Sequence, residues 1–151
     1  ILEYYAKECP WVTATASQIP WALDDGVGPM LPIMQSDIML TRGSEVLIID
    51  AKYYTHTTQK QYDIHKIHSS NLYQIFTYVK NKDMEFGVQP HTVSGMLLYA
   101  ATEEIQPDNS YQMSGNKISV RTLNLNYDFS EIAAQLNAIV DEHFSGLSDH
   151  L

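Results

Sequence analysis

Basic residues are scarce in this chain of 151 residues. Nine Lys and Arg side chains stand against eighteen Asp and Glu side chains, so the formal net charge is −9 at pH 7. Proteins that bind nucleic acid unaided usually present a broad basic face, because neutralising phosphates supplies much of the affinity. Two interpretations remain open. Either metal ions neutralise an acidic site while other domains or subunits supply nucleic-acid affinity, or the chain binds no nucleic acid.

Cysteines, long apolar runs and nucleotide-binding signatures are also rare or missing. The single cysteine, Cys9, permits no disulfide within the chain, which predicts a reducing compartment and hence the cytoplasm. No apolar run approaches the roughly 20 residues that a membrane-spanning helix needs, so we expect no contact with a membrane. There is no Gly-x-x-x-x-Gly-Lys-Ser/Thr motif that would cradle nucleotide phosphates.

The rest of the composition is that of a globular protein. Hydrophobic residues make up 44% of the chain and charged residues 18%, which is enough apolar material for a sizeable core. We therefore expect residues 1–151 to form a single domain. Because the chain starts with Ile1 inside a stretch predicted to be helical, we expect it to be the C-terminal part of a longer protein.

Two apolar, β-prone segments on either side of Gly43-Ser44 form the most informative stretch. Gly followed by Ser between such segments predicts a two-residue hairpin loop, with the positive φ of a type II′ turn at the glycine. This loop sets Asp37 directly opposite Asp50, with their Cβ atoms roughly 5 Å apart. Lys52 shares the face of Asp50 because it lies two residues further along the strand.

Two carboxylates and a lysine at the end of an apolar hairpin are suited to holding a divalent cation. Like charges at this separation repel each other unless something positive lies between them, and carboxylates are preferred ligands of Mg²⁺. We therefore predict that Asp37 and Asp50 ligate a metal. The alternative is that both are ordinary acidic residues at strand ends.

The spacing of these residues resembles a known nuclease motif. Asp37, twelve intervening residues and then Asp50-Ala51-Lys52 resemble the PD-(D/E)xK motif, except that Ser36 stands where the motif has proline. The surrounding sequence is similar to the nuclease domain of the McrC family, the endonuclease subunits of McrBC-type modification-dependent restriction systems. The similar segments read Leu-Pro-Ile-Met-Gln-Ser-Asp-Ile at 31–38 and Ile-Ile-Asp-Ala-Lys-Tyr-Tyr at 48–54.

The resemblance covers roughly residues 1–98 and implies an α/β restriction-endonuclease-like fold, with a central mixed β-sheet flanked by helices. It implies a Mg²⁺-dependent endodeoxyribonuclease of a 5-methylcytosine-type restriction system, with Mn²⁺ as a substitute. The implied partners are DNA and an AAA+ GTPase of the McrB type, contacted mainly through a region before Ile1. In this interpretation Asp37, Asp50 and the Ala51 carbonyl ligate the metal. Lys52 then positions or helps deprotonate the attacking water, or stabilises the transition state.

A further candidate lies on a helix expected to run from Ser69 or Ser70 to about residue 81. Gln74 and Tyr78 are four residues apart and so share a helix face. The Gln-x-x-x-Tyr pattern resembles the helix that follows the Asp-x-Lys strand in many such nucleases. The resemblance implies that Gln74 helps to orient the site or the nucleic-acid backbone, whereas Tyr78 is expected to pack. A surface role for Gln74 is the alternative.

Two other groups of residues are weaker candidates. His56, His65 and His68 invite a zinc interpretation, but no cysteine and no closely spaced third ligand supports it, so we expect surface histidines. Glu3 and Glu8 are the acidic residues of the first predicted helix, where members of this nuclease superfamily often carry a further Glu. We expect both to lie on a solvent-exposed face.

The remaining pattern predicts a chain of alternating strands and helices. The unbroken apolar run at 46–49 indicates a strand covered on both faces in the middle of a sheet. The apolar run at 93–101 predicts a central strand that is parallel to a neighbour, because a helix of crossover length precedes it. The other expected elements are a helix at 1–8, a strand at 11–17, loops at 20–32 and 80–91, strands at 34–41 and 46–53, a polar connection at 102–115, an edge strand at 117–125 and a last helix capped by Ser130.

Two further functions are compatible with these residues. One is a non-catalytic, nuclease-like structural module of a larger DNA-processing complex, which the acidic balance mildly favours and the intact set of Asp37, Asp50 and Lys52 disfavours. The other is a repair or junction nuclease of the same superfamily, which the identity of the partner would distinguish.

Overall fold

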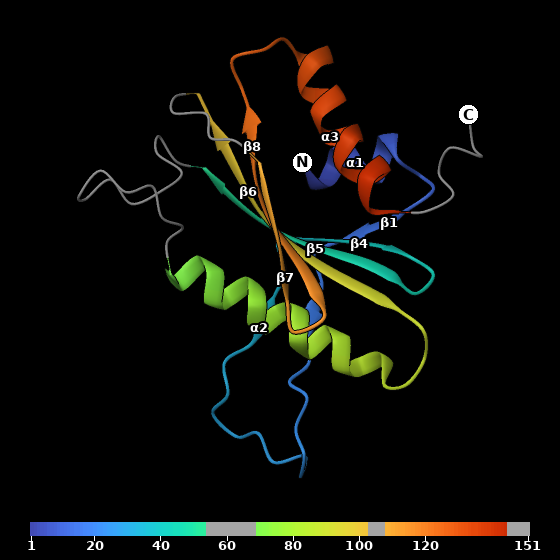
Figure 1. Cartoon of the computed structure of the whole chain (residues 1–151), viewed down its shortest axis with the longest axis vertical. Helices are drawn as coiled ribbons and strands as arrows, with labels where there is room; N and C mark the ends of the chain where they lie inside the picture. The colour runs from blue at the N-terminus through green and yellow to red at the C-terminus, as the bar shows by residue number, and fades with distance from the viewer. Residues whose placement is uncertain (54–68, 103–107, 145–151) are drawn as a thin grey trace.

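The structure is an α/β arrangement with a central mixed sheet and helices on both faces, as the sequence predicts (Figure 1). It is a computed structural model that describes residues 1–53, 69–102 and 108–144. The six-stranded sheet has the order β1-β4-β5-β6-β8-β7. The elements in chain order are α1 Leu2–Glu8, β1 Thr13–Thr15, β2 Gln18–Ile19, β3 Met34–Gln35, β4 Ile38–Arg42, β5 Glu45–Tyr53, α2 Ser69–Phe86, β6 Thr92–Ala101, β7 Asn109–Met113, β8 Asn116–Asn124 and α3 Phe129–His143.

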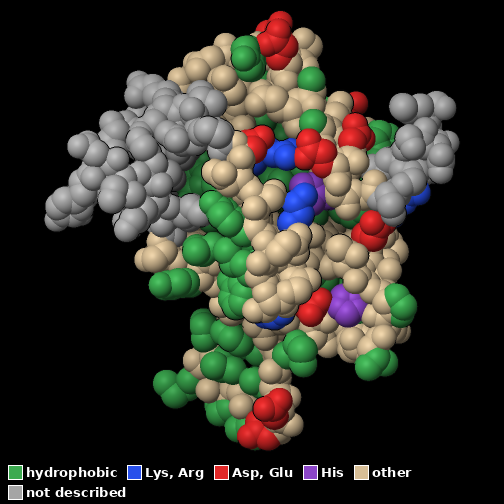
Figure 2. Space-filling view, in the orientation of Figure 1, with side chains coloured by type: hydrophobic (Ala, Val, Ile, Leu, Met, Phe, Trp, Pro, Cys, Tyr) green, Lys and Arg blue, Asp and Glu red, His purple; other side chains and the backbone are tan. Residues whose placement is uncertain are grey.

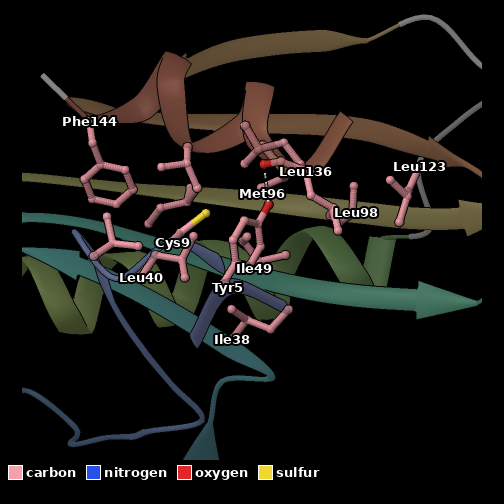
Figure 3. Close-up of a cluster of buried hydrophobic side chains, with 14 of the residues drawn as sticks. Tyr5, Cys9, Ile38, Leu40, Ile49, Met96, Leu98, Leu123, Leu136 and Phe144 are labelled. Carbon is pink, nitrogen blue, oxygen red and sulfur yellow. Dashed lines mark hydrogen bonds between the residues drawn. The ribbon is translucent and has the colours of Figure 1, made fainter. Parts of the chain in front are cut away.

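The core consists of two apolar clusters, one on each face of the sheet. Alternate residues of β5 serve the two clusters: Leu47 and Ile49 face α1 and α3, while Val46 and Ile48 face α2. Figure 3 shows the first cluster, in which the Tyr5 hydroxyl donates a hydrogen bond to the Leu136 carbonyl at 2.9 Å. Burial on both faces explains the unbroken apolar run of β5, because each fully buried aliphatic side chain contributes about 1.5–3 kcal/mol. The predicted central position of β5 is confirmed.

The hairpin of β4 and β5 has the register that its two-residue loop predicts. Ile38 pairs with Ile49 and Arg42 pairs with Glu45. Gly43 has a φ of +59°, whereas Ser44 is not among the residues with positive φ, which is the combination of a type II′ turn. Strands β5 and β6 are parallel over nine residue pairs, so the predicted parallel central strand is also confirmed.

The strand expected at 34–41 is divided in two by a bulge. Strand β3 pairs with β2, and β4 pairs with β1 and β5. Thr15 pairs with Met39, and Gln18 pairs with Gln35. Between these two pairs, the two residues 16–17 lie opposite the three residues 36–38, which is the count of a bulge. The buried Ser36 donates its backbone N–H to the Ser17 carbonyl at 3.0 Å. Such an extra residue bends the strand and interrupts its ladder, which leaves Asp37 outside the regular pairing.

The loop predicted at 20–32 is confirmed and projects from the sheet (Figure 1). Its base is fastened by two hydrogen bonds: Trp21 Nε1 donates to the Pro32 carbonyl at 2.7 Å, and the backbone N–H of Ala22 donates to Asn81 Oδ1 at 2.8 Å. Figure 2 shows apolar side chains along this projection and acidic ones at its end. Trp21 packs partly buried against the α2 side of the core, which is a structural role.

Helix α2 is longer than the sequence predicts, so the expected loop at 80–91 is wrong for residues 80–86. The added turns are held by polar contacts that periodicity does not reveal. Lys80 Nζ donates to Asn116 Oδ1 at 2.8 Å, and Asp83 accepts from His91 Nε2 at 2.7 Å. Gly87, with a φ of +60°, follows the last helical residue. A glycine in this conformation is a common helix terminator.

The C-terminal third corrects two more expectations. Strand β8 is not an edge strand, because β7 pairs antiparallel with it and takes the edge position. The turn between them has positive φ at both Ser114 and Gly115, as in a type I′ hairpin, so part of the expected polar connection is a strand. Helix α3 is capped by Asp128 and not by Ser130: Asp128 Oδ1 accepts the Glu131 N–H at 3.0 Å. Strand β1, at three residues, is shorter than expected.

No helix within the described ranges is both long and apolar enough to cross a membrane.

Candidate metal site at the end of the hairpin

The two predicted acidic residues meet where β5 leaves the apolar core. Asp50 follows the buried run of β5 and is itself only 4% exposed. Asp37 is exposed and lies at the bulge before β4. Its Oδ2 accepts the backbone N–H of Ala51 at 3.0 Å, so its side chain occupies the place that a backbone acceptor would have in a longer strand. The structure therefore brings Asp37, Asp50 and Ala51 together, as the hairpin register predicts.

Burial and the neighbouring acid both perturb the Asp50 carboxyl. The pKa of Asp50 is raised to about 6, mainly by loss of solvent and then by a hydrogen bond with Asp37, while Lys52 acts in the opposite direction. Burial and the neighbouring Asp37 carboxyl both disfavour the ionised form of Asp50. A cation between the two carboxylates would relieve the same repulsion. The electrostatics of the pair therefore match the chemistry of a metal ligand set.

One buried carboxylate oxygen of the site lacks a hydrogen-bond donor among the described residues. Asp50 Oδ2 is buried and accepts no hydrogen bond from the described residues. Lys52 Nζ lies 3.3 Å from it as an ion pair. Within one extended residue, the N–H and the C=O point to the same side of the strand. The Ala51 carbonyl is therefore directed toward the side on which its N–H meets Asp37. Two carboxylates and a carbonyl fit a divalent cation.

The ligand set offered by the described residues is small and consists of oxygen atoms. No group of three or more His, Cys, Asp or Glu side chains with metal-ligand geometry occurs in the ranges 1–53, 69–102 and 108–144. Mg²⁺ is commonly bound through one or two carboxylates and keeps several waters, so it suits such a set. His56, His65 and His68 lie outside the described residues.

Lys52 lies on the same face of β5 as Asp50, on the side that carries α2. Its Cα partner in the parallel ladder is Tyr99 of β6, which is completely buried. The Lys52 side chain is one quarter exposed, with its ammonium group turned toward Asp50. The lysine therefore presents a positive charge beside the acidic pair while part of its stem is covered.

Gln74 belongs to the helix that covers this face. Gln74 Nε2 donates to the Tyr78 hydroxyl at 2.9 Å, and Tyr78 is buried, which confirms the prediction that Tyr78 packs. One turn earlier, Asn71 Nδ2 donates to the Tyr99 hydroxyl at 3.2 Å. The start of α2 therefore lies against β6 at the level of Lys52. The structure places Gln74 on the helix beside the site with its amide on Tyr78.

Sequence reasoning missed Asn71 and Tyr99. Both are buried, at 7% and 0% exposure, and both carry polar groups inside a largely apolar cluster. Tyr99 stands in the apolar run at 93–101, from which only a central strand was predicted. The available signal was the parallel register, which makes Tyr99 the neighbour of Lys52 once β5 and β6 are paired. The predicted solvent-exposed positions of Glu3 and Glu8 are confirmed, on the helix that packs against the opposite face.

Two comparisons with known proteins bear on this site. Residues 30–100, which include the hairpin and the start of α2, match the family model for the McrBC 5-methylcytosine restriction system component. The chain is also 29% identical over 146 residues to the type IV methyl-directed restriction enzyme EcoKMcrBC of Escherichia coli (strain K12). That alignment covers 95% of this chain, and so extends beyond the 1–98 expected, but only 41% of the relative. The chain thus spans about two fifths of the length of this relative.

Proposed function

We propose that this chain belongs to the McrC family and is the metal-dependent nuclease part of a modification-dependent restriction endonuclease; the family-model match over residues 30–100 and the 29% identity to the Escherichia coli enzyme support this. Its substrate in this proposal is DNA that the assembled system selects for its 5-methylcytosine, and its reaction is hydrolysis of a phosphodiester bond. The observation that carries the proposal is the hydrogen bond of 3.0 Å from the Ala51 N–H to Asp37 Oδ2. It joins the bulge to the end of β5 beside Asp50. We further propose a PD-(D/E)xK core that forms a single nuclease domain of a longer chain.

In the proposed mechanism Asp37, Asp50 and the Ala51 carbonyl hold Mg²⁺, with Mn²⁺ as a substitute. A bound Mg²⁺ would supply positive charge against the charge that develops on the phosphate oxygens, and it would make a water molecule more acidic. Lys52, with its ammonium group 3.3 Å from Asp50, positions the attacking water. The water oxygen forms a bond to phosphorus as the water loses a proton, the bond from phosphorus to the leaving sugar oxygen breaks, and that oxygen takes up a proton, so the products are a phosphate monoester and a sugar hydroxyl. Gln74 is proposed to help orient the site or the nucleic-acid backbone.

The proposed partners account for the acidic balance of the chain. With a net charge of −9, the chain offers no broad platform for phosphates. DNA affinity and recognition of the modified base are therefore assigned to a partner, an AAA+ GTPase of the McrB type. We propose that this partner is engaged mainly by parts of the longer protein that precede Ile1, and that the complex works in the cytoplasm.

The same acidic balance favours a second candidate function, a nuclease-like structural module without catalysis. Cleavage by the full complex separates the two. If divalent cations support cleavage by the wild-type complex and Asp37→Ala abolishes it, the chain is catalytic. Equal cleavage by both complexes would assign the chemistry to another subunit. A repair or junction nuclease of the same superfamily would instead act with a partner other than an AAA+ GTPase.

The first experiment is a calorimetric titration with Mn²⁺ of the wild type, Asp50→Ala and Asp24→Ala. The last variant is a matched control, because it removes one negative charge from the exposed loop away from the hairpin. We expect binding at about one ion per chain in the wild type and the control, and none in Asp50→Ala. Absence of binding in the wild type, together with no divalent-dependent cleavage by its complex, would overturn the proposal.

A further inference from the structure

We infer that Asn71 and Tyr99 are positioning residues, whose hydrogen bond fixes Lys52 and Gln74 relative to Asp50. This inference rests on the proposed function, because it assigns a task to two residues beside the proposed metal site. Neither residue touches the two acids in the contacts described above. Their action would be exerted through the lysine and through the first turn of α2.

The first observation is the pairing of Tyr99 with Lys52. They are Cα partners in the parallel ladder of β5 and β6, so their side chains emerge side by side on the α2 face. Neighbouring strands are about 4.8 Å apart, which brings the Tyr99 ring beside the lysine stem. Tyr99 is fully buried and its hydroxyl is held by Asn71 Nδ2 at 3.2 Å, so this hydrogen bond sets where the ring lies. The ring restricts a side chain with four rotatable bonds and keeps its ammonium group on the Asp50 side.

The second observation is the polar character of the pair in an apolar surrounding. Asn71 and Tyr99 are buried where α2 meets the sheet, in a region otherwise formed by residues such as Ile75, Val79 and Leu97. A buried amide is costly unless it is hydrogen-bonded, and two apolar side chains of similar shape could give the same stability. The hydrogen bond of 3.2 Å therefore contributes a defined position of the helix rather than extra stability.

The third observation is the place of Asn71 on the helix. Asn71 lies in the first turn of α2, and Gln74 is three residues later on the same side. The bond from Asn71 to Tyr99 joins the helix that carries Gln74 to the strand beside the one that carries Asp50 and Lys52. Loss of this bond would loosen both candidate groups together, while Asp37 and Asp50, which the hairpin positions, would stay in place.

The test uses Tyr99→Phe, Asn71→Leu and the double variant, in the full-length protein assembled with its partner. Tyr5→Phe is the matched control, since it also removes a buried, hydrogen-bonded hydroxyl, but on the opposite face of the sheet. Each of the three single variants, including Tyr5→Phe, removes one side of a buried hydrogen bond, so all three should melt at lower temperature. The double variant removes both polar groups and should recover most of that loss.

Positioning and mere structural support predict different cleavage rates. We expect Tyr99→Phe, Asn71→Leu and the double variant to cleave plasmid DNA containing 5-methylcytosine roughly tenfold to a hundredfold more slowly at saturating DNA. The DNA concentration for half-maximal rate and the Mn²⁺ affinity should change less than threefold, and Tyr5→Phe should cleave at the wild-type rate. Recovery of the cleavage rate along with the melting temperature in the double variant would overturn the inference.

A second readout does not depend on cleavage. Lysine acylation at fixed pH, without metal or DNA, followed by mass spectrometry of the Lys52 peptide reports how freely this side chain moves. Lys52 should react at least threefold faster in Tyr99→Phe and in the double variant, with Lys82 as the internal reference. An unchanged rate would refute the positioning role. Failure of the proposed function is recognised separately, by equal cleavage in the wild type and in Asp37→Ala.

Discussion

Replacing Gly95 with alanine should push α2 away from the sheet. A Cβ atom on Gly95 would lie 2.6 Å from Val79 Cγ2, 2.9 Å from Ile75 Cγ1 and 3.2 Å from Ile118 Cδ1. Carbon atoms in favourable contact are about 3.5–4.0 Å apart, so the helix would have to retreat by about 1 Å. Two of the obstructing atoms belong to branched side chains held close to the helix backbone, which cannot turn aside freely.

The magnitude follows from overpacking of a close-packed core. An added methyl group in such a place typically costs about 1–3 kcal/mol. The lower flexibility of alanine in the unfolded chain offsets about 0.5–1 kcal/mol of this. We therefore expect a net loss of roughly 1–2 kcal/mol, which corresponds to a fall in melting temperature of about 2–8 °C for a domain of this size.

The assay is urea unfolding followed by circular dichroism, with Gly28→Ala as the control. A Cβ on Gly28 would also be crowded, at 2.8 Å and 3.2 Å, but only by the ends of two partly exposed leucine side chains. The midpoint should fall for Gly95→Ala and stay nearly constant for Gly28→Ala. Equal midpoints for Gly95→Ala and the wild type would refute the close packing of α2 on β6. Mn²⁺ binding at the hairpin should persist, because neither acidic residue lies on α2.

Three further predictions test the site and the fold. Lys52→Ala should slow DNA cleavage by about 10²–10³-fold with Mn²⁺ affinity nearly unchanged by calorimetry, and collapse of metal binding would contradict its proposed role. The His91 ring nitrogens face the Gln89 carbonyl and Asp83, and the pKa of His91 is raised first by that carbonyl. The contribution of His91 to the free energy of unfolding should therefore be complete below about pH 6.5 and decline as pH rises through the raised pKa. Urea midpoints measured as a function of pH should show this decline in the wild type but not in His91→Gln. Asp128→Ala should lower the melting temperature of the protein more than Ser130→Ala, and the reverse order would contradict the cap.

Local patterns were sufficient for most of the secondary structure. The Gly43-Ser44 loop determined the register of β4 and β5 because a two-residue turn leaves one pairing compatible with both apolar strands. The central place of β5 followed from its uninterrupted apolar run. The same reasoning brought Asp37, Asp50 and Lys52 to one end of the hairpin, although their chemical roles remain predictions.

Features that depend on contacts between distant segments could not be predicted. The extra turns of α2 depend on Asn116 and His91, which become neighbours only after the sheet has formed. The Asn71–Tyr99 contact requires the parallel pairing of β5 with β6, and no local periodicity indicates a polar contact in an apolar strand. Strand β7 is exposed at four of its five residues and has only Tyr111 and Met113 as apolar side chains, so hydrophobic alternation was too weak to reveal it.

The bulge before β4 explains why Asp37 can serve a site at all. In an uninterrupted ladder, backbone carbonyls of the strand before Ile38 would accept the N–H groups of β5. The Asp37 carboxylate would then have no free N–H of β5 to accept. The extra residue at 36–38 ends that ladder at Ile38, and Ser36 turns its backbone to Ser17 instead. The Asp37 carboxylate then takes the Ala51 N–H that the missing backbone would have bound. This arrangement holds one exposed carboxylate beside one buried carboxylate, which is the pair that the proposed metal site requires.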